Sequence, residues 1–413
     1  MATELPAVEL IIKTVNLSRN SIICDFKTYA MKVIESTTNI SVVANNWFPD
    51  NPGGLDRYVY ELVHHLANDD TKVDLFGIGM PAQELAVPVQ LRNLASPEAS
   101  LAGRLWSAYR RSRPLSFSKS DAINFHFALY GLAAIPHLPD DVPITCTFHG
   151  PWAVESQQEG GSQLAVWLKQ QMEQLVYNRC DRFIVLSKAF GSILNETYQV
   201  PWEKISIVPG GVDTGHFRNT MTRQQAREHL GWPQDRLILF TPRRLVHRMG
   251  LDKLIDAVAR LGNQKQELWL GIAGRGPLKE SLQRRVEDLD LEQSVKLLGF
   301  LPDEDLPIAY QAADLTVMPS QSLEGFGLVI LESLACGTPA LCTPVGGMPE
   351  IIEPFAPALV TAAASTNAIA SALMEIVSGN LAMPTREECR AYAVEHFDWP
   401  HIADRVKQIL LAP

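Results

Sequence analysis

The sequence predicts an α/β protein with two domains, each built on a parallel β-sheet that helices cover on both faces. The chain has 413 residues, more than a single hydrophobic core usually organises. Its composition, 46% hydrophobic and 20% charged, is that of an ordinary globular protein. In both halves, short apolar runs alternate with stretches of helical periodicity, which is typical of parallel strands joined by crossover helices.

The first half is expected to begin with a buried strand at 40–47 (ISVVANNW), followed by the loop FPDNPGG. Apolar residues in the next segment, 55–66, recur at helical spacing, so we expect a helix there. The other strands expected in this half have the sequences KVDLFGI, AINFHFA, ITCTFHG and RFIVLS, and KISIVPGGVD closes the half. Together these elements are expected to form an N-terminal domain over 39–212.

The second half repeats this alternation. LILFTPRR (237–244) is expected to form a strand and LDKLIDAVARLG a helix. Further strands are expected in ELWLGIAGRGP, VKLLGFLP and LTVMPS, and EGFGLVILESLACG is a loop that leads into a helix. We expect the C-terminal domain to span 213–396 and a final helix, 397–413, to return to the N-terminal domain.

Residues 1–38 precede the first expected strand and are interpreted as an N-terminal extension. The sequence leaves open whether this extension is ordered, and Met31 is an alternative start of the natural chain. Its short apolar patch follows the acidic residues Glu4 and Glu9, which argues against a secretory signal peptide.

The overall composition argues against several classes of protein. A formal net charge of −10 is unfavourable for a nucleic-acid-binding surface, so no nucleic-acid partner is expected. The six cysteines are too scattered for a disulfide scaffold or a metal knuckle, and reduced thiols in the cytoplasm fit them best. No apolar run approaches the roughly 20 residues that a membrane-spanning helix needs.

The segment from Glu324 to Glu332, EGFGLVILE, is the strongest functional signal. Gly325 and Gly327 precede a run that should be helical, and glycines let backbone amides approach a ligand closely. Because a helix N-terminus favours anions, a diphosphate fits this position. The two carboxylates can accept hydrogen bonds from the hydroxyls of a sugar and a ribose. The alternative is an ordinary helix with an acidic cap.

This segment resembles the E-x7-E signature of the retaining glycosyltransferases of family 4 and their relatives, which include glycogen and sucrose-phosphate synthases. Further motifs resemble the family in order and spacing from about residue 40 onward: PGG, TFHG, VPGGVD, TPRRLVHRMG, AGRGP, LGFL, AADLTVMPS and PVGGMPE. The resemblance implies the GT-B fold, with two Rossmann-like domains and an active site in the cleft between them. Ligands of parallel sheets bind outside the carboxyl ends of the strands, which indicates the same cleft.

The resemblance also implies how a nucleotide-sugar donor is held. Glu324 would contact the donor sugar and Glu332 the ribose. Three short segments would contribute further donor contacts: Gly53 and Gly54 at the phosphates, Gly299, Phe300 and Leu301 beside the base, and Phe326, Gly327 and Leu328 beside the sugar and diphosphate.

Arg244 aligns with the arginine that neutralises the diphosphate in this family. The position of the usual lysine, immediately before Gly250, is Met249, which cannot supply positive charge. Arg248 either grips a phosphate in its place, as a guanidinium can, or is a surface arginine. The same departure supports a rival hypothesis, in which the chain binds sugar nucleotides without turnover.

Two histidines and a tryptophan are further site candidates. His149 follows an expected strand, and the resemblance makes it an active-site histidine near the donor C6 hydroxyl and the acceptor. His126 lies at the end of another expected strand, where buried packing is the alternative interpretation. Trp152 falls on the presumed acceptor side, where its ring can stack on a sugar.

No metal ligand and no cofactor are predicted. The motifs 288–290 and 303–305 mimic the D-x-D metal motif, but they are interpreted as solvated residues at helix ends. Arg244 and helix amides would then stabilise the donor phosphates in place of magnesium.

A basic segment at 103–119 contains five Arg and Lys residues and no acidic residue, with aromatic residues between them. It is interpreted as a solvated helix, as a contact to an anionic membrane, or as part of a site for an anionic acceptor. The sequence therefore leaves peripheral membrane contact open.

The sequence as a whole predicts a retaining hexosyltransferase that uses a nucleoside diphosphate sugar, with UDP as the expected nucleotide. The resemblance implies a metal-independent front-face reaction. The acceptor, whether a glycan, a lipid or a small metabolite, is not indicated, and neither is the oligomeric state. The alternatives are a GT-B sugar-nucleotide epimerase and a non-catalytic subunit that binds sugar nucleotides.

Overall fold

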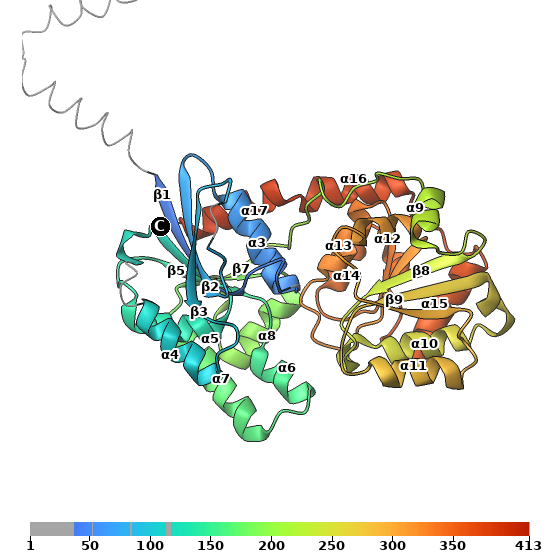
Figure 1. The fold of residues 1–413 in the computed structure, drawn as a ribbon, viewed down its shortest axis with the longest axis horizontal. Coiled ribbons are helices and arrows are strands. Elements are labelled where there is room, and N and C mark those ends of the chain that lie inside the picture. Colours follow the sequence, from blue (N-terminus) through green and yellow to red (C-terminus); the bar gives the residue numbers. More distant parts are fainter. Residues whose placement is uncertain (1–36, 52, 83–84, 113–116, 413) are drawn as a thin grey trace, which may run out of the picture.

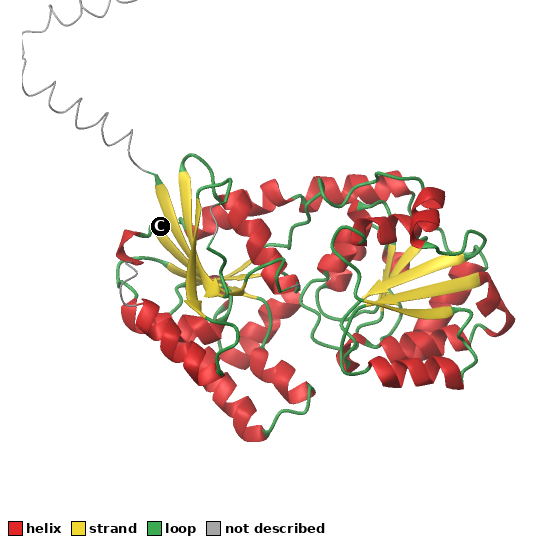
Figure 2. Cartoon of the chain, viewed as in Figure 1, coloured by secondary structure: helices red, strands yellow, loops and turns green. Residues whose placement is uncertain are grey.

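The computed structural model describes residues 37–51, 53–82, 85–112 and 117–412, and Figure 1 shows two α/β domains side by side. Both have a parallel sheet with helices packed on it (Figure 2), as the sequence predicted. Nearly all of the expected extension, 1–38, lies outside the described residues. No helix in the described ranges is long and apolar enough to cross a membrane.

The N-terminal domain has a seven-stranded sheet in the order β3-β2-β1-β4-β5-β6-β7. Its strands are β1 (Thr38–Asn46), β2 (Thr71–Ile78), β3 (Val89–Ala95), β4 (Ala122–Phe125), β5 (Ile144–Phe148), β6 (Arg182–Val185) and β7 (Ile205–Ile207). Its helices are α3 (Gly54–Leu66), α4 (Leu101–Ser112), α5 (Ala128–Ala134), α6 (Trp152–Gln158), α7 (Gln163–Tyr177) and α8 (Lys188–Tyr198), with short 3-10 turns η1 (Phe117–Lys119), η2 (Ile135–His137) and η3 (Trp202–Lys204). The strand order reverses between β1 and β4, and the loops after these strands open a crevice there.

Both faces of this sheet are buried. Ile40 and Val42 of β1 pack in one apolar cluster with α3, and Val43 packs in a second cluster with α4, α5 and α7. Side chains alternate between the two faces of the sheet along a strand, so the side chains on both faces must be apolar when both faces are buried. The strand therefore shows as a continuous apolar run in the sequence. The edge strand β3 was not predicted, because its exposed Gln90 and Asn93 interrupt such a run.

The C-terminal domain has a five-stranded sheet in the order β10-β9-β8-β11-β12. Its strands are β8 (Leu237–Pro242), β9 (Leu268–Ala273), β10 (Val295–Gly299), β11 (Leu315–Met318) and β12 (Ala340–Cys342). Its helices are α9 (Arg223–Leu230), α10 (Leu251–Ala259), α11 (Lys279–Asp288), α12 (Leu306–Ala312), α13 (Leu328–Ala335), α14 (Met348–Ile352), α15 (Thr366–Val377) and α16 (Arg386–Phe397), with turns η4 (His247–Met249), η5 (Gly262–Glu267) and η6 (Pro357–Leu359).

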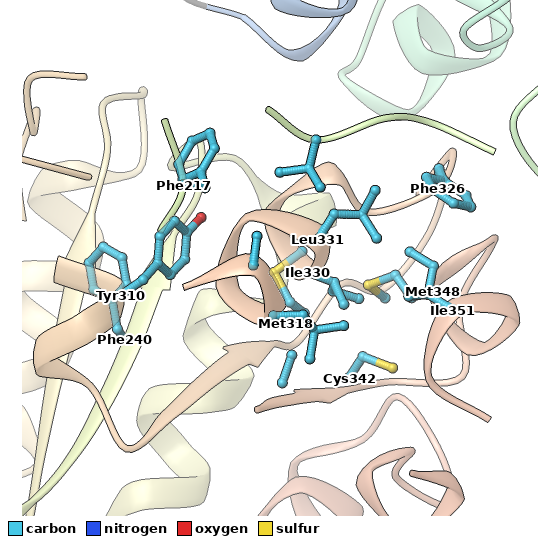
Figure 3. Close-up of a cluster of buried hydrophobic side chains, with 14 of the residues drawn as sticks. Phe217, Phe240, Tyr310, Met318, Phe326, Ile330, Leu331, Cys342, Met348 and Ile351 are labelled. Carbon is cyan, nitrogen blue, oxygen red and sulfur yellow. The ribbon is translucent and has the colours of Figure 1, made fainter. Parts of the chain in front are cut away.

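A tightly packed apolar cluster fixes α13 on this second sheet (Figure 3). Ile330 and Leu331 of α13 are fully buried with Met318 of β11 and Met348 of α14. Because protein interiors are close-packed, this cluster leaves the start of α13 little freedom to move relative to the strands. The loop before α13 is therefore attached to a helix whose position is fixed by packing.

The chain passes between the domains twice, once after β7 and once after α16. At the crossings, the Val212 amide donates to the Phe397 carbonyl at 2.8 Å, and Val212 forms a parallel β-bridge with Asp398. The last helix, α17 (Trp399–Leu410), then packs on α3 of the N-terminal domain. The Trp399 ring meets the Tyr58 ring edge-on, with their centroids 5.1 Å apart.

Replacing Trp399 with alanine should lower the free energy of unfolding by about 3–5 kcal/mol, because a large side chain that is 2% exposed leaves a cavity. Equilibrium denaturation in urea, followed by circular dichroism, measures the change. Trp106→Ala is the matched control, since Trp106 is 63% exposed and its loss should change stability by less than about 0.5 kcal/mol. Equal effects of the two substitutions would contradict the role of Trp399 as an anchor.

Candidate active site

A cleft of about 680 Å³ lies between the carboxyl ends of the two sheets. Its walls are loops that follow β1, β4 and β5 in one domain and β8 and β11 in the other. Most of the predicted site residues border it: Gly53, Gly54, His126, His149, Trp152, Arg244, Arg248, Glu324, Phe326, Gly327 and Leu328. The other predicted residues do not border this cleft: Gly299, Phe300, Leu301 and Glu332.

Glu324 borders the cleft from the loop between β11 and α13. Its carboxylate accepts hydrogen bonds from Ser320 Oγ, at 3.0 Å, and from the guanidinium of Arg243, which directly follows β8. Arg243 donates to Ser320 Oγ as well, at 2.5 Å. Only 11% of the Glu324 side chain is exposed, so the carboxylate is held in one orientation with lone pairs left for a ligand. The sequence analysis missed Arg243, although it adjoins Arg244.

The start of α13 forms the next part of the wall. Gly327 precedes the helix with φ 103°, a left-handed conformation that glycine adopts without strain. No side chain caps this end of the helix, so its first amides remain available to an anion. The loop is also tied to the N-terminal domain, because Ser187 Oγ donates to the Gly325 carbonyl at 2.6 Å.

Positive charge at the cleft comes from arginines. Arg244 is exposed, whereas Arg248 is largely buried and donates to the Leu323 carbonyl at 3.0 Å. Burial lowers the pKa of Arg248, and its Nε has no partner among the described residues. Met249 is 5% exposed and packs in the hydrophobic core. The position of the family's usual lysine is thus filled by a core side chain.

Glu155 of α6 is a cleft residue that the sequence analysis did not single out. Its Oε1 lies 3.6 Å from a terminal nitrogen of Arg248, across the boundary between the domains. Burial raises the pKa of Glu155, and Arg248 and Arg244 oppose this shift. A carboxylate of the N-terminal domain therefore faces the cleft arginines. Glu155 lies three residues after Trp152, but no spacing in the sequence indicated which way its side chain points.

Trp152 begins α6 at the edge of the cleft, and its surroundings hold it in place. Its backbone amide donates to Oε1 of the buried Glu173 at 2.8 Å. Its ring packs edge-on against Phe127, and the Lys169 ammonium lies 4.6 Å from its centroid. The indole is therefore presented from a fixed helix start, as a stacking surface requires.

His126 and His149 form a pair at the carboxyl ends of the neighbouring strands β4 and β5. His126 Nδ1 lies 2.9 Å from His149 Nε2, and the Tyr58 ring packs edge-on against His149. Burial lowers the pKa of His149 to about 3 and also lowers that of His126, which the neighbouring ring depresses further. Both rings are therefore neutral near pH 7, and one nitrogen of the contact carries the shared hydrogen.

Glu332 borders a small cavity next to the main cleft, and Leu328 borders both. The Tyr310 hydroxyl donates to Glu332 Oε2 at 2.7 Å. Burial raises the pKa of Glu332, and the Arg57 guanidinium from α3 opposes this effect most strongly. Arg57 also forms an ion pair with Asp303 of the C-terminal domain. The guanidinium of this one residue of the N-terminal domain therefore interacts with two carboxylates of the C-terminal domain.

Gly299 is the last residue of β10, and Phe300 and Leu301 follow it, with a single residue between Leu301 and Asp303. Gly299 has φ 74°, and its carbonyl accepts a hydrogen bond from the Gly274 amide at 2.6 Å. The Phe300 ring is 44% exposed, with the Arg275 guanidinium 4.4 Å from its centroid. Through the ion pair of Asp303 with Arg57, the segment that follows this loop is connected to a residue that lines the small cavity.

The loop with Gly53 and Gly54 is held by Asp56. The Asp56 carboxylate accepts from the Asn46 amide at 3.2 Å and from Asn51 Nδ2 at 2.7 Å. These contacts keep the start of α3 at the cleft, where Gly54 lies within reach of Leu328 across the domain boundary.

The neutral histidine pair should make stability depend on pH. The unfolded chain protonates His149 near its ordinary pKa of 6.5, and the folded protein only near 3. Between pH 6.5 and pH 3 the unfolded state therefore binds more protons than the folded state. The free energy of unfolding is highest above pH 6.5 and falls as the pH decreases, by about 1 kcal/mol per pH unit. His149→Gln should therefore lose stability less steeply than the wild type between about pH 7 and about pH 5. Urea denaturation of both proteins tests this, with His65→Gln as the control, and parallel curves for wild type and His149→Gln would refute it.

Two family models match most of the chain. "Glycosyltransferase Family 4" matches residues 52–216, and "Glycosyl transferases group 1" matches 222–396. A D-inositol 3-phosphate glycosyltransferase from Pseudarthrobacter chlorophenolicus is 30% identical over 73% of this chain and 76% of its own length. A GDP-mannose-dependent phosphatidylinositol monomannoside mannosyltransferase from Mycolicibacterium smegmatis is 32% identical over 51% of this chain and 57% of its own.

Solved structures share the fold at lower sequence identity. Sucrose-phosphate synthase from Thermosynechococcus elongatus superposes with a TM-score of 0.75, at 22% identity, over 90% of this chain and 98% of its own. HepE from Anabaena, solved with UDP and glucose, has a TM-score of 0.70 at 20% identity, over 91% of this chain and all of its own. The chain therefore belongs to the family 4 type glycosyltransferases of the GT-B fold and is a hexosyltransferase.

Proposed function

We propose that this enzyme transfers a hexosyl group from a nucleoside diphosphate sugar, with UDP as the nucleotide, to an acceptor hydroxyl with retention of anomeric configuration. The observation that carries the proposal is the Glu324 carboxylate, which Arg243 and Ser320 hold at the edge of the cleft. A fixed carboxylate beside the uncapped start of α13 suits the hydroxyls of a sugar whose diphosphate binds the helix amides.

The proposed donor lies along the C-terminal wall of the cleft. Its diphosphate is neutralised by Arg244 and by Arg248, whose guanidinium already lies beside the Glu155 carboxylate. Its ribose is assigned to the Glu332 carboxylate; the cavity beside this carboxylate holds only about 10 Å³, so the ring itself would lie in the main cleft next to Leu328. Its base lies along the backbone of 299–301.

The comparisons support a nucleotide-sugar donor and leave the base open. HepE has been solved with UDP-glucose, and the relative from Mycolicibacterium smegmatis is named as GDP-mannose-dependent. We propose UDP as the nucleotide of the donor, and a binding screen of UDP, GDP and ADP decides among the three nucleotides.

In the proposed mechanism the departing phosphate helps to deprotonate the acceptor on the same face of the sugar. Arg244, Arg248 and the first amides of α13 stabilise the developing negative charge as preorganised donors, without a metal ion. The neutral His149 presents a ring nitrogen to a donor hydroxyl, and His126 behind it keeps the ring oriented. Trp152 and Glu155 face the acceptor, a glycan, a lipid or a small metabolite.

Glu324→Gln should lower kcat/KM for the donor by about a hundredfold or more, because the held carboxylate loses its charge and its geometry with Arg243. A thermal-shift screen of UDP, GDP, ADP and their sugars first identifies the nucleotide, and turnover with the best donor follows. The exposed Glu304→Gln is the control and should retain full activity. Unchanged turnover in Glu324→Gln would exclude the proposed role of this carboxylate.

The product of an α-linked donor should carry an α linkage, as NMR of the anomeric proton shows. The rate should stay the same when EDTA is added, since the arginines supply the positive charge. A β-linked product would rule out retention, and a rate abolished by EDTA would rule out the metal-free mechanism. Release of free nucleotide and an epimerised sugar without acceptor would instead identify an epimerase.

A further inference from the structure

The outer surface of one helical layer of the N-terminal domain carries a concentration of exposed apolar side chains. Of the eleven large hydrophobic residues that are exposed in the described part of the chain, six lie on α4 and α7. Leu101 and Trp106 belong to α4, and the others to α7: Leu164, Trp167, Leu168 and Leu175. Single exposed apolar residues are ordinary, whereas a concentration on one surface marks a site of interaction.

These side chains lie on one face of the domain. Helices α4 and α7 both pack against α5, and all three cover the same side of the sheet (Figure 1). The outward faces of helices in one layer point the same way. Between α4 and α7, the half-buried Leu132, Ile135 and Leu138 continue the apolar character. We call this surface, formed by the outward side chains of α4, α5, η2 and α7, the α4–α7 face.

The charged side chains exposed on the helices of this face are basic. Apart from Glu173, the charged residues of α4, α5, η2, α7 and the adjoining η1 are Arg, Lys and His. Glu173 is 1% exposed and bonded to backbone amides at the start of α6, so it does not reach the surface. Arg110, Arg111 and Lys119 are exposed. Exposed acids lie at the margins of the face, Glu98 before α4 and Asp140 and Asp141 after η2, and not on the helices themselves.

We propose that the α4–α7 face docks on the surface of a membrane that contains anionic lipids. Trp and Leu side chains on a basic helical layer have the composition of an interfacial membrane contact, with the apolar groups among the acyl chains and the cations at the headgroups. Of the basic segment 103–119, only the described residues of α4 and Lys119 enter this proposal, together with α7; residues 113–116 lie outside the described ranges.

Charge also argues against a second copy of this chain as the occupant. A twofold contact between copies places a surface against itself, so the arginines of α4 would meet one another. An anionic membrane pairs with them instead. Since α6 leads directly into α7, docking would also hold the Trp152 end of the cleft close to the headgroups.

The test is flotation of the full-length protein with vesicles. Vesicles of phosphatidylcholine and phosphatidylglycerol should carry the protein upward in a density gradient, and vesicles of phosphatidylcholine alone should carry about tenfold less. The double variant Trp106→Ser/Trp167→Ser should bind the anionic vesicles at least about tenfold more weakly. Arg110→Ser/Arg111→Ser should weaken binding by about tenfold and remove the dependence on salt.

Trp202→Ser is the matched control, because Trp202 is an exposed tryptophan of the same domain outside the α4–α7 face, and it should float like the wild type. Circular dichroism and the nucleotide thermal shift, which do not involve this face, show that each variant is folded. The proposal is wrong if wild-type protein stays at the bottom of the gradient or if the tryptophan pair is dispensable for flotation. It is also wrong if light scattering shows a dimer that Trp106→Ser/Trp167→Ser converts to a monomer.

Discussion

The loop from Ser320 to Gly327 is the constraint on which the cleft depends. Three polar groups of this short segment are bound by three different parts of the chain: the Leu323 carbonyl by Arg248, the Glu324 carboxylate by Arg243, and the Gly325 carbonyl by Ser187 of the other domain. The apolar cluster below α13 supplies the rigid base. A loop held in this way is preorganised, so a ligand does not have to order it on binding.

The fold was predictable because burial on both faces makes each central strand a continuous apolar run, with glycine-containing loops between the runs. The elements that escaped prediction lack this signature: β3 is an edge strand with exposed polar residues, and β12 has only three residues. The motif from Glu324 to Glu332 could be located in the sequence because both of its carboxylates lie on one local stretch of chain.

The contacts across the domain boundary could not be predicted in the same way. Arg57 meets Asp303, and Glu155 meets Arg248, only because the two domains are packed in a particular orientation. No spacing within either half encodes that orientation. The resemblance indicated Arg244 but not its neighbour Arg243, whose importance rests on a carboxylate that is far away in sequence. Electrostatic partners of a cleft are thus the part of a two-domain site that sequence patterns reveal least.

The paired crossings at Val212 and Asp398 limit how the domains can rearrange. The two covalent connections between the domains run side by side there and are hydrogen-bonded to each other. Because α17 stays packed on α3, it moves with the N-terminal domain, while α16 moves with the C-terminal domain. Any opening of the cleft would therefore have to bend both crossings together, because Val212 and Asp398 are bridged to each other.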